Sequence, residues 1–183
     1  RDTFLDHPSG VRVLLAPERL NTIETLDATR IVKALTRLRT HFDYLICDTS
    51  SSLDSLSAAL LLAADLVLFV VTPEVPALRD LQRVLNEVPS LRSESRSLVV
   101  LNRYPSRVGL DLKEVERGLG RTVSATIPSR GVEIGQAVNK GFSVASMSTN
   151  LVLNQAVAKL ADLLQGEVAS ERAPVTIQAV GSI

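Results

Sequence analysis

Short runs of apolar residues alternate along the chain with segments whose apolar residues recur every three or four positions. Most of these runs are continuously apolar, which is typical of strands that are buried on both faces of a parallel sheet. We predict strands at residues 44–47, 66–71, 98–101 and 123–127, with an earlier candidate at residues 11–15.

The segments between the runs have the spacing of amphipathic helices. Ile31, Leu35 and Leu38, for example, share one face of a helix. Gly120 and Gly141 are placed to close two other helices at their C-terminal ends. Helices are predicted at residues 31–42, 78–88, 111–119, 132–140 and 153–164.

Strands that alternate with helices imply βαβ crossovers. The predicted fold is therefore α/β, with a doubly wound and mostly parallel sheet between two layers of helices. The helical periodicity stops after Gly166. We expect one domain over residues 1–166 and a loose tail over residues 167–183.

Composition excludes several classes of function. Of the 183 residues 45% are hydrophobic, which is enough for a sizeable core. The 20 basic and 20 acidic residues balance, which argues against a protein whose whole surface attracts nucleic acid or acidic substrates. Only 3% of residues are aromatic, which argues against base stacking. The apolar stretch at residues 58–71 is interrupted by Asp65 and is too short to span a bilayer. We expect a soluble, cytoplasmic protein without direct membrane insertion.

Two groups of side chains receive a structural interpretation. Cys47 is the single cysteine and lies inside an apolar run, so we interpret it as an inert core thiol. Arg30, Lys33 and Arg37 fall opposite the apolar stripe of their helix and read as a solvated face. The alternative for these three is a contact with an acidic partner or nucleic acid.

Candidate chemistry lies at the carboxyl ends of the predicted strands, where open parallel sheets bind ligands. Polar or turn-forming residues begin there at Asp48, Thr72, Asn102 and Pro128. Asp48 follows four apolar residues and has two interpretations. It could hold Mg²⁺ through water, as a Walker B carboxylate does, or it could cap the next helix or a turn.

Two other catalytic patterns are missing from the sequence. Ser50, Ser51 and Ser52 have no flanking glycines and no histidine after them, so they do not match a hydrolase nucleophile elbow. The phosphate-binding sequence Gly-x4-Gly-Lys-Ser/Thr does not occur either.

Several segments in succession resemble the MinD/ParA ATPases, a family of P-loop NTPases with a deviant Walker A loop. Residues 42–49 resemble the Walker B segment of that family. Further similar segments follow in the family's order at residues 63–80, 98–104, 112–120, 126–128 and 137–141. Residues 7–17, 101–104 and 119–121 resemble the CpaE/TadZ branch, which helps to position and assemble Flp/Tad pili.

The resemblance implies a P-loop NTPase-like fold that is incomplete at its N-terminus and truncated before Walker B. The first strand, the Walker A loop and the first helix would then precede Arg1. In this picture Asp48 helps to hold Mg²⁺ through water. Asn102, with Arg103 beside it, recognises the base of ATP or ADP, while Pro128 and Ser129 line the other side of the adenine.

The resemblance also implies partners. Asp80 matches a residue near the dimer face of the family, so the intact protein is expected to form a homodimer. Its other partners would be pilus-assembly or polar-localisation proteins, and no nucleic acid is expected.

One departure from the family concerns the segment after Asp48. The family usually has proline and glycine there, and the glycine lets a backbone N–H approach the γ-phosphate, whereas this chain has Ser50, Ser51 and Ser52. We expect the intact parent to be a weak ATPase and this chain alone to be inactive. The alternatives are a non-hydrolysing scaffold with the same fold and a DNA-partitioning ParA-type ATPase.

Overall fold

A computed structural model describes residues 4–15, 27–51, 54–143, 151–169 and 175–180. Strand β1 (Leu5–Asp6) pairs antiparallel with β2 (Arg12–Val13) in a small hairpin. Gly10 turns this hairpin with a φ of 87°, a conformation that favours glycine. The earlier strand expected at residues 11–15 therefore exists in shorter form, but outside the main sheet.

The main sheet contains five strands in the order β3-β7-β4-β5-β6, and all neighbouring strands are parallel. The four strands predicted for the main sheet are confirmed with small shifts of their ends. The strands are β3 (Tyr44–Thr49), β4 (Leu66–Val71), β5 (Ser97–Asn102), β6 (Ala125–Ile127) and β7 (Val175–Val180).

Each predicted helix is present, and one further helix joins β3 to β4. This additional helix, α3, overlaps the first part of the apolar stretch, before Asp65, and starts after its N-cap residue Asp54. The helices are α2 (Ala28–Leu38), α3 (Ser55–Ala63), α4 (Val75–Glu87), α5 (Leu112–Leu119), α6 (Gly131–Asn139) and α7 (Leu151–Ala169), with a 3₁₀ turn η1 (Pro89–Arg92) after α4. Among those in the described part of the chain, none combines the length and apolarity of a bilayer-crossing helix.

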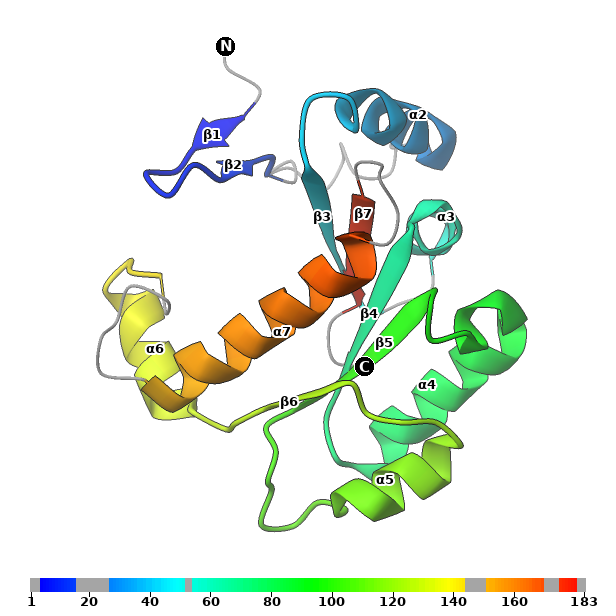
Figure 1. Cartoon of the computed structure of the whole chain (residues 1–183), viewed down its shortest axis with the longest axis vertical. Helices are drawn as coiled ribbons and strands as arrows, with labels where there is room; N and C mark the ends of the chain where they lie inside the picture. Colours follow the sequence, from blue (N-terminus) through cyan, green and yellow to red (C-terminus); the bar gives the residue numbers. More distant parts are fainter. Residues whose placement is uncertain (1–3, 16–26, 52–53, 144–150, 170–174, 181–183) are drawn as a thin grey trace.

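Helices cover both faces of the sheet (Figure 1). On one face, Phe69 of β4 and Leu81 of α4 belong to a buried core that also includes Val115 of α5. On the other face, Leu68 of β4 packs in a second cluster with Leu160 of α7. The predicted three-layer α/β architecture is therefore confirmed.

Helix α7 packs against β4, β5 and β6, and among the described elements it does not extend its packed cluster to β3. Side chains alternate along a strand, so Tyr44, Ile46 and Asp48 share one face of β3. Ile46 is 70% exposed and Tyr44 is 41% exposed. On the opposite face Cys47 is half-buried between α2 and α3, and burial raises the pKa of its thiol, as expected for a packed rather than a reactive cysteine.

The predicted loose tail is wrong for two of its segments. Helix α7 continues through Gly166 to Ala169, and Val175–Val180 forms strand β7 inside the main sheet. A glycine inside a helix costs only about 1 kcal/mol relative to alanine, so Gly166 does not have to end α7. The pairing partners of β7 are more than a hundred residues away along the chain, which local periodicity does not detect.

The N-cap of α3 leads to a prediction about acid stability. The Asp54 carboxylate accepts a hydrogen bond from the Ser57 backbone N–H at 2.7 Å, and this bond lowers the pKa of Asp54. Because the folded-state pKa lies below the unfolded one, Asp54 stabilises the protein above the unfolded pKa, near 3.9, and this contribution is lost as pH falls through the folded pKa.

We expect Asp54→Asn to leave the free energy of unfolding at neutral pH within about 0.5 kcal/mol of wild type, because asparagine caps almost as well as aspartate. The variant should lose less stability than wild type as the pH falls below about 5. Urea unfolding across that pH range is the measurement. Asp162→Asn, at an exposed position of α7, is the matched control and should follow wild type. Parallel pH profiles for wild type and Asp54→Asn would contradict the prediction.

Candidate functional site

The carboxyl ends of β3, β4, β5 and β6 meet at one edge of the main sheet, because all these strands run parallel. The sequence-predicted residues Asp48, Asn102, Arg103, Pro128 and Ser129 all lie at or just beyond this edge. We call it the carboxyl edge. It is the position at which open parallel sheets bind ligands.

Asp48 is the second-last residue of β3, which ends at Thr49, and it is exposed. Asp48 does not cap the following helix, because Asp54 occupies the N-cap of α3. The other part of that second interpretation, a cap of a turn, stays a prediction. In the described part of the chain, no three His, Cys, Asp or Glu side chains converge on a common point. A single carboxylate suits Mg²⁺, which keeps most of its waters.

Asn102 and Arg103 form a turn at the end of β5 that is held by a side-chain hydrogen bond. The Asn102 side-chain oxygen accepts a hydrogen bond from the Arg103 backbone N–H at 2.9 Å. Arg103 has a φ of 57°, which is uncommon for a residue other than glycine and marks a constrained position. The Asn102 amide therefore turns its oxygen towards the backbone, and its two N–H groups are the donors that it can offer to a ligand.

The end of β6 lies directly beside this turn. Asn102 and Ile127 are register partners, and the Tyr104 backbone N–H donates to the Ile127 carbonyl at 3.0 Å. Pro128 and Ser129 follow Ile127, so the structure brings them next to Asn102 and Arg103. These four predicted residues form one cluster at the end of the sheet near β6.

Asp48 and Asp80 lie apart from that cluster. Three strand spacings separate β3 from β5, which corresponds to about 14 Å. This span is comparable to an extended nucleotide that reaches from its base to its phosphates. Asp80 is half-buried on α4, five residues after the first helical residue Val75, or about 7.5 Å along the helix, so it is not part of the carboxyl edge.

The loop between β5 and α5 is held against the end of β4, a contact that sequence reasoning missed. The Leu110 backbone N–H donates to the Pro73 carbonyl at 2.8 Å. A Cβ atom on Gly109 would lie 2.7 Å from that oxygen and 2.8 Å from Pro73 Cγ. At the other end of the loop, the Tyr104 hydroxyl accepts from the Leu112 N–H at 3.3 Å. The signal in the sequence for this contact was Gly109, which stands two residues before Asp111, the N-cap of α5.

This contact predicts a large effect for a small substitution. We expect Gly109→Ala to lower the free energy of unfolding by about 1–3 kcal/mol, because the added methyl group overlaps backbone and ring atoms of Pro73. Chemical denaturation is the measurement. Gly118→Ala is the matched control: Gly118 is exposed on α5 with nothing within 4 Å of the added Cβ, and the change should stabilise the protein by about 0.5–1 kcal/mol. Equal effects of the two substitutions would contradict the prediction.

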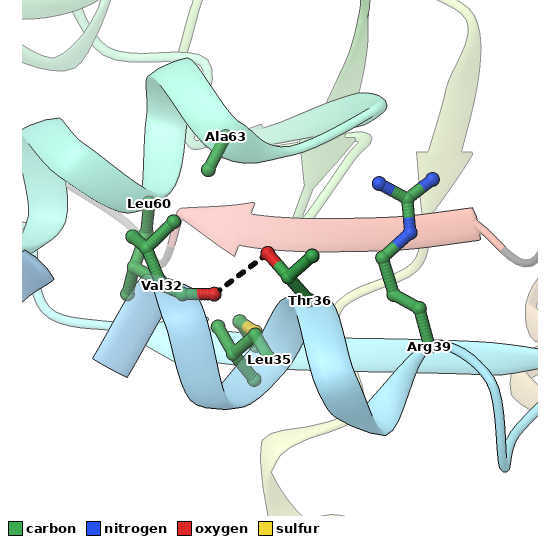
Figure 2. A pocket seen from close by; sticks show the side chains of 7 residues that line it. Val32, Leu35, Thr36, Arg39, Leu60 and Ala63 are labelled. Atoms are coloured by element: carbon green, nitrogen blue, oxygen red, sulfur yellow. Dashed lines mark hydrogen bonds between the residues drawn. The ribbon is translucent and has the colours of Figure 1, made fainter. Parts of the chain in front are cut away.

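Two hollows lie near the site. A groove of about 500 Å³ runs between β6 and α7 and is lined by Tyr104, Thr126 and Pro128 on one side and by Lys159 on the other. A second cavity of about 20 Å³ lies between α2, α3 and Cys47, next to Leu35 and Leu60 (Figure 2). It has room for about one water molecule, so it is a packing gap rather than a cofactor site.

Helix α2 presents its predicted basic face on the outside of the protein. Arg30, Lys33 and Arg37 are exposed. Arg39, at the end of this helix, instead forms an ion pair with Asp65 at 3.0 Å that connects α2 to the start of β4.

An open parallel α/β sheet with a polar cluster and a carboxylate at one edge is the architecture of nucleotide-binding α/β proteins. The chain belongs to the AAA domain family, whose model matches residues 7–100. Its sequence is also similar to the septum site-determining protein MinD of Thermotoga maritima, with 28% identity over 160 residues that cover 84% of this chain and 58% of the relative, which supports a P-loop ATPase of the MinD/ParA type.

Individual relatives agree with this assignment. The chain is 30% identical over 167 residues to an uncharacterized ATP-binding protein of Methanocaldococcus jannaschii, an alignment that covers 91% of this chain and 63% of the relative. A ParA family ATPase of Chlorobium tepidum has a similar fold, with a TM-score of 0.79 at 22% identity over 88% of this chain and 66% of that structure. The septum site-determining protein MinD of Pyrococcus horikoshii, solved with Mg-ADP, gives 0.71 at 19% identity over 85% and 63%. The chain thus spans about two thirds or less of the length of these relatives.

Proposed function

We propose that this chain is part of an ATP-binding localisation factor of the MinD/ParA type, and that it belongs to the CpaE/TadZ-like factors of Flp/Tad pilus assembly. The observation that carries the proposal is the carboxyl edge, which has Asp48 at one end and the cluster of Asn102, Arg103, Pro128 and Ser129 at the other. Family membership, and the Mg-ADP bound to the Pyrococcus relative, support a nucleotide across this edge.

In this proposal the two ends of the edge have different tasks. Asp48 holds Mg²⁺ through water, as its exposed carboxylate at the end of β3 permits. Asn102 donates its amide N–H groups to the adenine, with Arg103 beside it and Pro128 and Ser129 on the other side of the base. Bound ATP supplies the phosphates and the charge that Mg²⁺ neutralises.

The proposed assignment to the CpaE/TadZ branch, and the partners that it implies, rest on shorter motifs. Residues 7–17, 101–104 and 119–121 are the segments that resemble CpaE/TadZ proteins. We propose that the intact protein acts in the cytoplasm as a homodimer with Asp80 near its dimer face. Pilus-assembly or polar-localisation proteins would be its partners.

The first test concerns the chain by itself. Its sequence has no Gly-x4-Gly-Lys-Ser/Thr loop, whose backbone N–H groups and lysine supply most of the affinity for a triphosphate. We therefore expect it to bind Mg·ATP no more tightly than about 1 mM, near −4 kcal/mol, without turnover. Titration calorimetry is the measurement. Micromolar binding that disappears in Asp48→Ala would show that the chain has a complete phosphate site of its own.

The second test uses a longer parent that binds ATP. Asn102→Ala should weaken ATP binding by about 1–3 kcal/mol, because it leaves an adenine edge without its hydrogen-bond partner. It should also reduce the preference for ATP over GTP. Arg107→Ala, at an exposed position of the same loop, is the matched control and should bind as wild type does. Unchanged affinity of Asn102→Ala for both nucleotides would remove Asn102 from the site.

A second candidate function is a non-hydrolysing scaffold that keeps the same fold but has lost the nucleotide switch. Ser50, Ser51 and Ser52 favour it, because they stand where the resemblance predicts proline and glycine. Ser50 and Ser51 are exposed at the carboxyl edge, and Ser52 lies outside the described residues. Tight ATP binding by the parent with no phosphate release would favour the scaffold, whereas turnover that requires Asp48 would favour the ATPase.

A further inference from the structure

Tyr104 joins the turn at the end of β5 to its neighbouring elements. It follows Asn102 and Arg103 directly along the chain. Its backbone N–H donates to the Ile127 carbonyl of β6 at 3.0 Å, and its hydroxyl accepts from the N–H of Leu112, the first residue of α5, at 3.3 Å. Its ring packs against the buried core that β4 forms with α4 and α5. Tyr104 is therefore anchored in β6, in α5 and in the core.

The turn before Tyr104 has a conformation that needs support from its surroundings. Arg103 is in the left-handed region, with a φ of 57°, which is unfavourable for a residue other than glycine. The hydrogen bond from its N–H to the Asn102 side-chain oxygen joins adjacent residues, so it does not fix where the turn lies relative to β6. Such a conformation persists where the surrounding structure holds it, and the anchors of Tyr104 are the contacts directly beside it.

We propose that Tyr104 is the positioning residue of the base site. It holds the turn beside Pro128 and so keeps the Asn102 amide in the place from which it distinguishes adenine from guanine. This inference rests on the proposed function, because it requires that Asn102 binds the base. Tyr104 acts through Asn102 and does not have to touch the nucleotide. Support of this kind matters because donors that recognise a ligand must be held within about 0.5 Å of the productive geometry.

The ratio of two affinities distinguishes positioning from a purely structural role. A loss of folding stability reduces the fraction of binding-competent protein, and this weakens the binding of ATP and of GTP by the same factor. A displaced Asn102 amide instead weakens the recognition of adenine in particular. A change in the preference for ATP over GTP is therefore the result that the positioning role predicts.

The test measures the binding of ATP and GTP to a longer parent by titration calorimetry. Tyr104→Ala removes the ring and the hydroxyl but keeps the backbone N–H, and it should reduce the preference for ATP by about tenfold. Tyr104→Phe keeps the ring and should restore the preference to within about threefold of wild type. Val123→Ala is the matched control, because Val123 packs against the same core but stands before β6, and it should leave the preference unchanged.

A double variant shows whether Tyr104 acts through Asn102. Tyr104→Ala added to Asn102→Ala should change the preference for ATP by less than about twofold, because the amide that Tyr104 positions is already absent. Effects of the two substitutions that multiply would mean that they act independently, and this would overturn the positioning role.

Hydrogen exchange tests the support of the turn in the present chain without nucleotide. In Tyr104→Ala the Arg103 amide should exchange several-fold faster than in wild type, whereas the buried Val100 amide in β5 should keep its rate. An unchanged rate at Arg103 would overturn the positioning role. If Tyr104→Ala does not fold, as judged by circular dichroism, Tyr104→Leu replaces it in each experiment, since leucine refills the core but has no hydroxyl.

The outcomes separate this inference from the proposed function. If the parent does not bind ATP, or if Asn102→Ala keeps the preference for ATP, the base site is overturned and the inference with it. If Asn102→Ala loses the preference and Tyr104→Ala keeps it, only the positioning role is overturned. Loss of the preference in both single variants, without a further loss in the double variant, supports the inference.

Discussion

Phe69→Ala is expected to lower the free energy of unfolding by about 3–5 kcal/mol, a large share of the total stability of a domain of this size. Phe69 lies on β4, next to β7 and β5, and is only 1% exposed. Its ring belongs to the core that β4 forms with α4 and α5. Removal of the ring loses its transfer free energy and leaves a cavity that the surrounding backbone cannot close.

Urea or guanidinium unfolding measures this loss. Leu62→Ala is the matched control, since Leu62 lies on α3 and is 65% exposed, and it should change the stability by no more than about 0.5 kcal/mol. A loss below about 1 kcal/mol for Phe69→Ala would mean that β4 is not packed at the centre of the sheet as described.

Arg121→Ala is expected to cost about 2–3 kcal/mol, although Arg121 lies at the opposite end of β5 from the carboxyl edge. The guanidinium donates from Nη1 to the Ser97 hydroxyl at 2.9 Å and to the Leu91 carbonyl at 3.2 Å, and from Nη2 to the Ser97 carbonyl at 2.6 Å. Ser97 is fully buried, so its carbonyl would lose a charged hydrogen-bond partner that water replaces poorly.

Arg121 is half-buried, so its charge is partly removed from water, and the alanine variant removes this desolvation cost. Burial lowers the pKa of Arg121, opposed by the charge of Glu94. We expect the lost hydrogen bonds to outweigh this relief. Arg117→Ala, an exposed arginine four residues away on α5, is the matched control and should stay within about 0.5 kcal/mol of wild type. Thermal unfolding of both variants tests the difference, and equal midpoints would contradict it.

Local patterns in the sequence were sufficient for most of the fold. Continuously apolar runs identified β4 and β5, because strands buried on both faces need no polar positions. A similar run identified β3, although one face of that strand is exposed, and β6 was identified from a run that also contains Ser124 and Thr126. Gly120 was expected to close a helix, and it ends α5 with a φ of 67°. The carboxyl edge followed from the same reasoning, since parallel strands bring their ends together. The adjacency of Asn102 and Pro128 did not, because it depends on the pairing of β5 with β6.

Other features depend on which residues are near one another in space. Nothing in the residues around Gly109 shows that Pro73 lies against it, and the role of Asp54 rather than Asp48 as the cap of α3 depends on where β3 stops. The separation of Asp48 from the Asn102 cluster likewise depends on the order of the strands, which periodicity does not contain.

The sequence by itself therefore determined most of the elements, the α/β class and the residues at the strand ends, because these depend on short-range spacing and on the burial of apolar side chains. Tertiary structure alone decided that residues 175–180 form a central strand. Their sequence lies beyond the last helical periodicity, but the gap between β3 and β4 presents backbone groups on both sides that an inserted strand can pair with. This pairing is non-local, and it determines how β3 and Asp48 are held in the sheet.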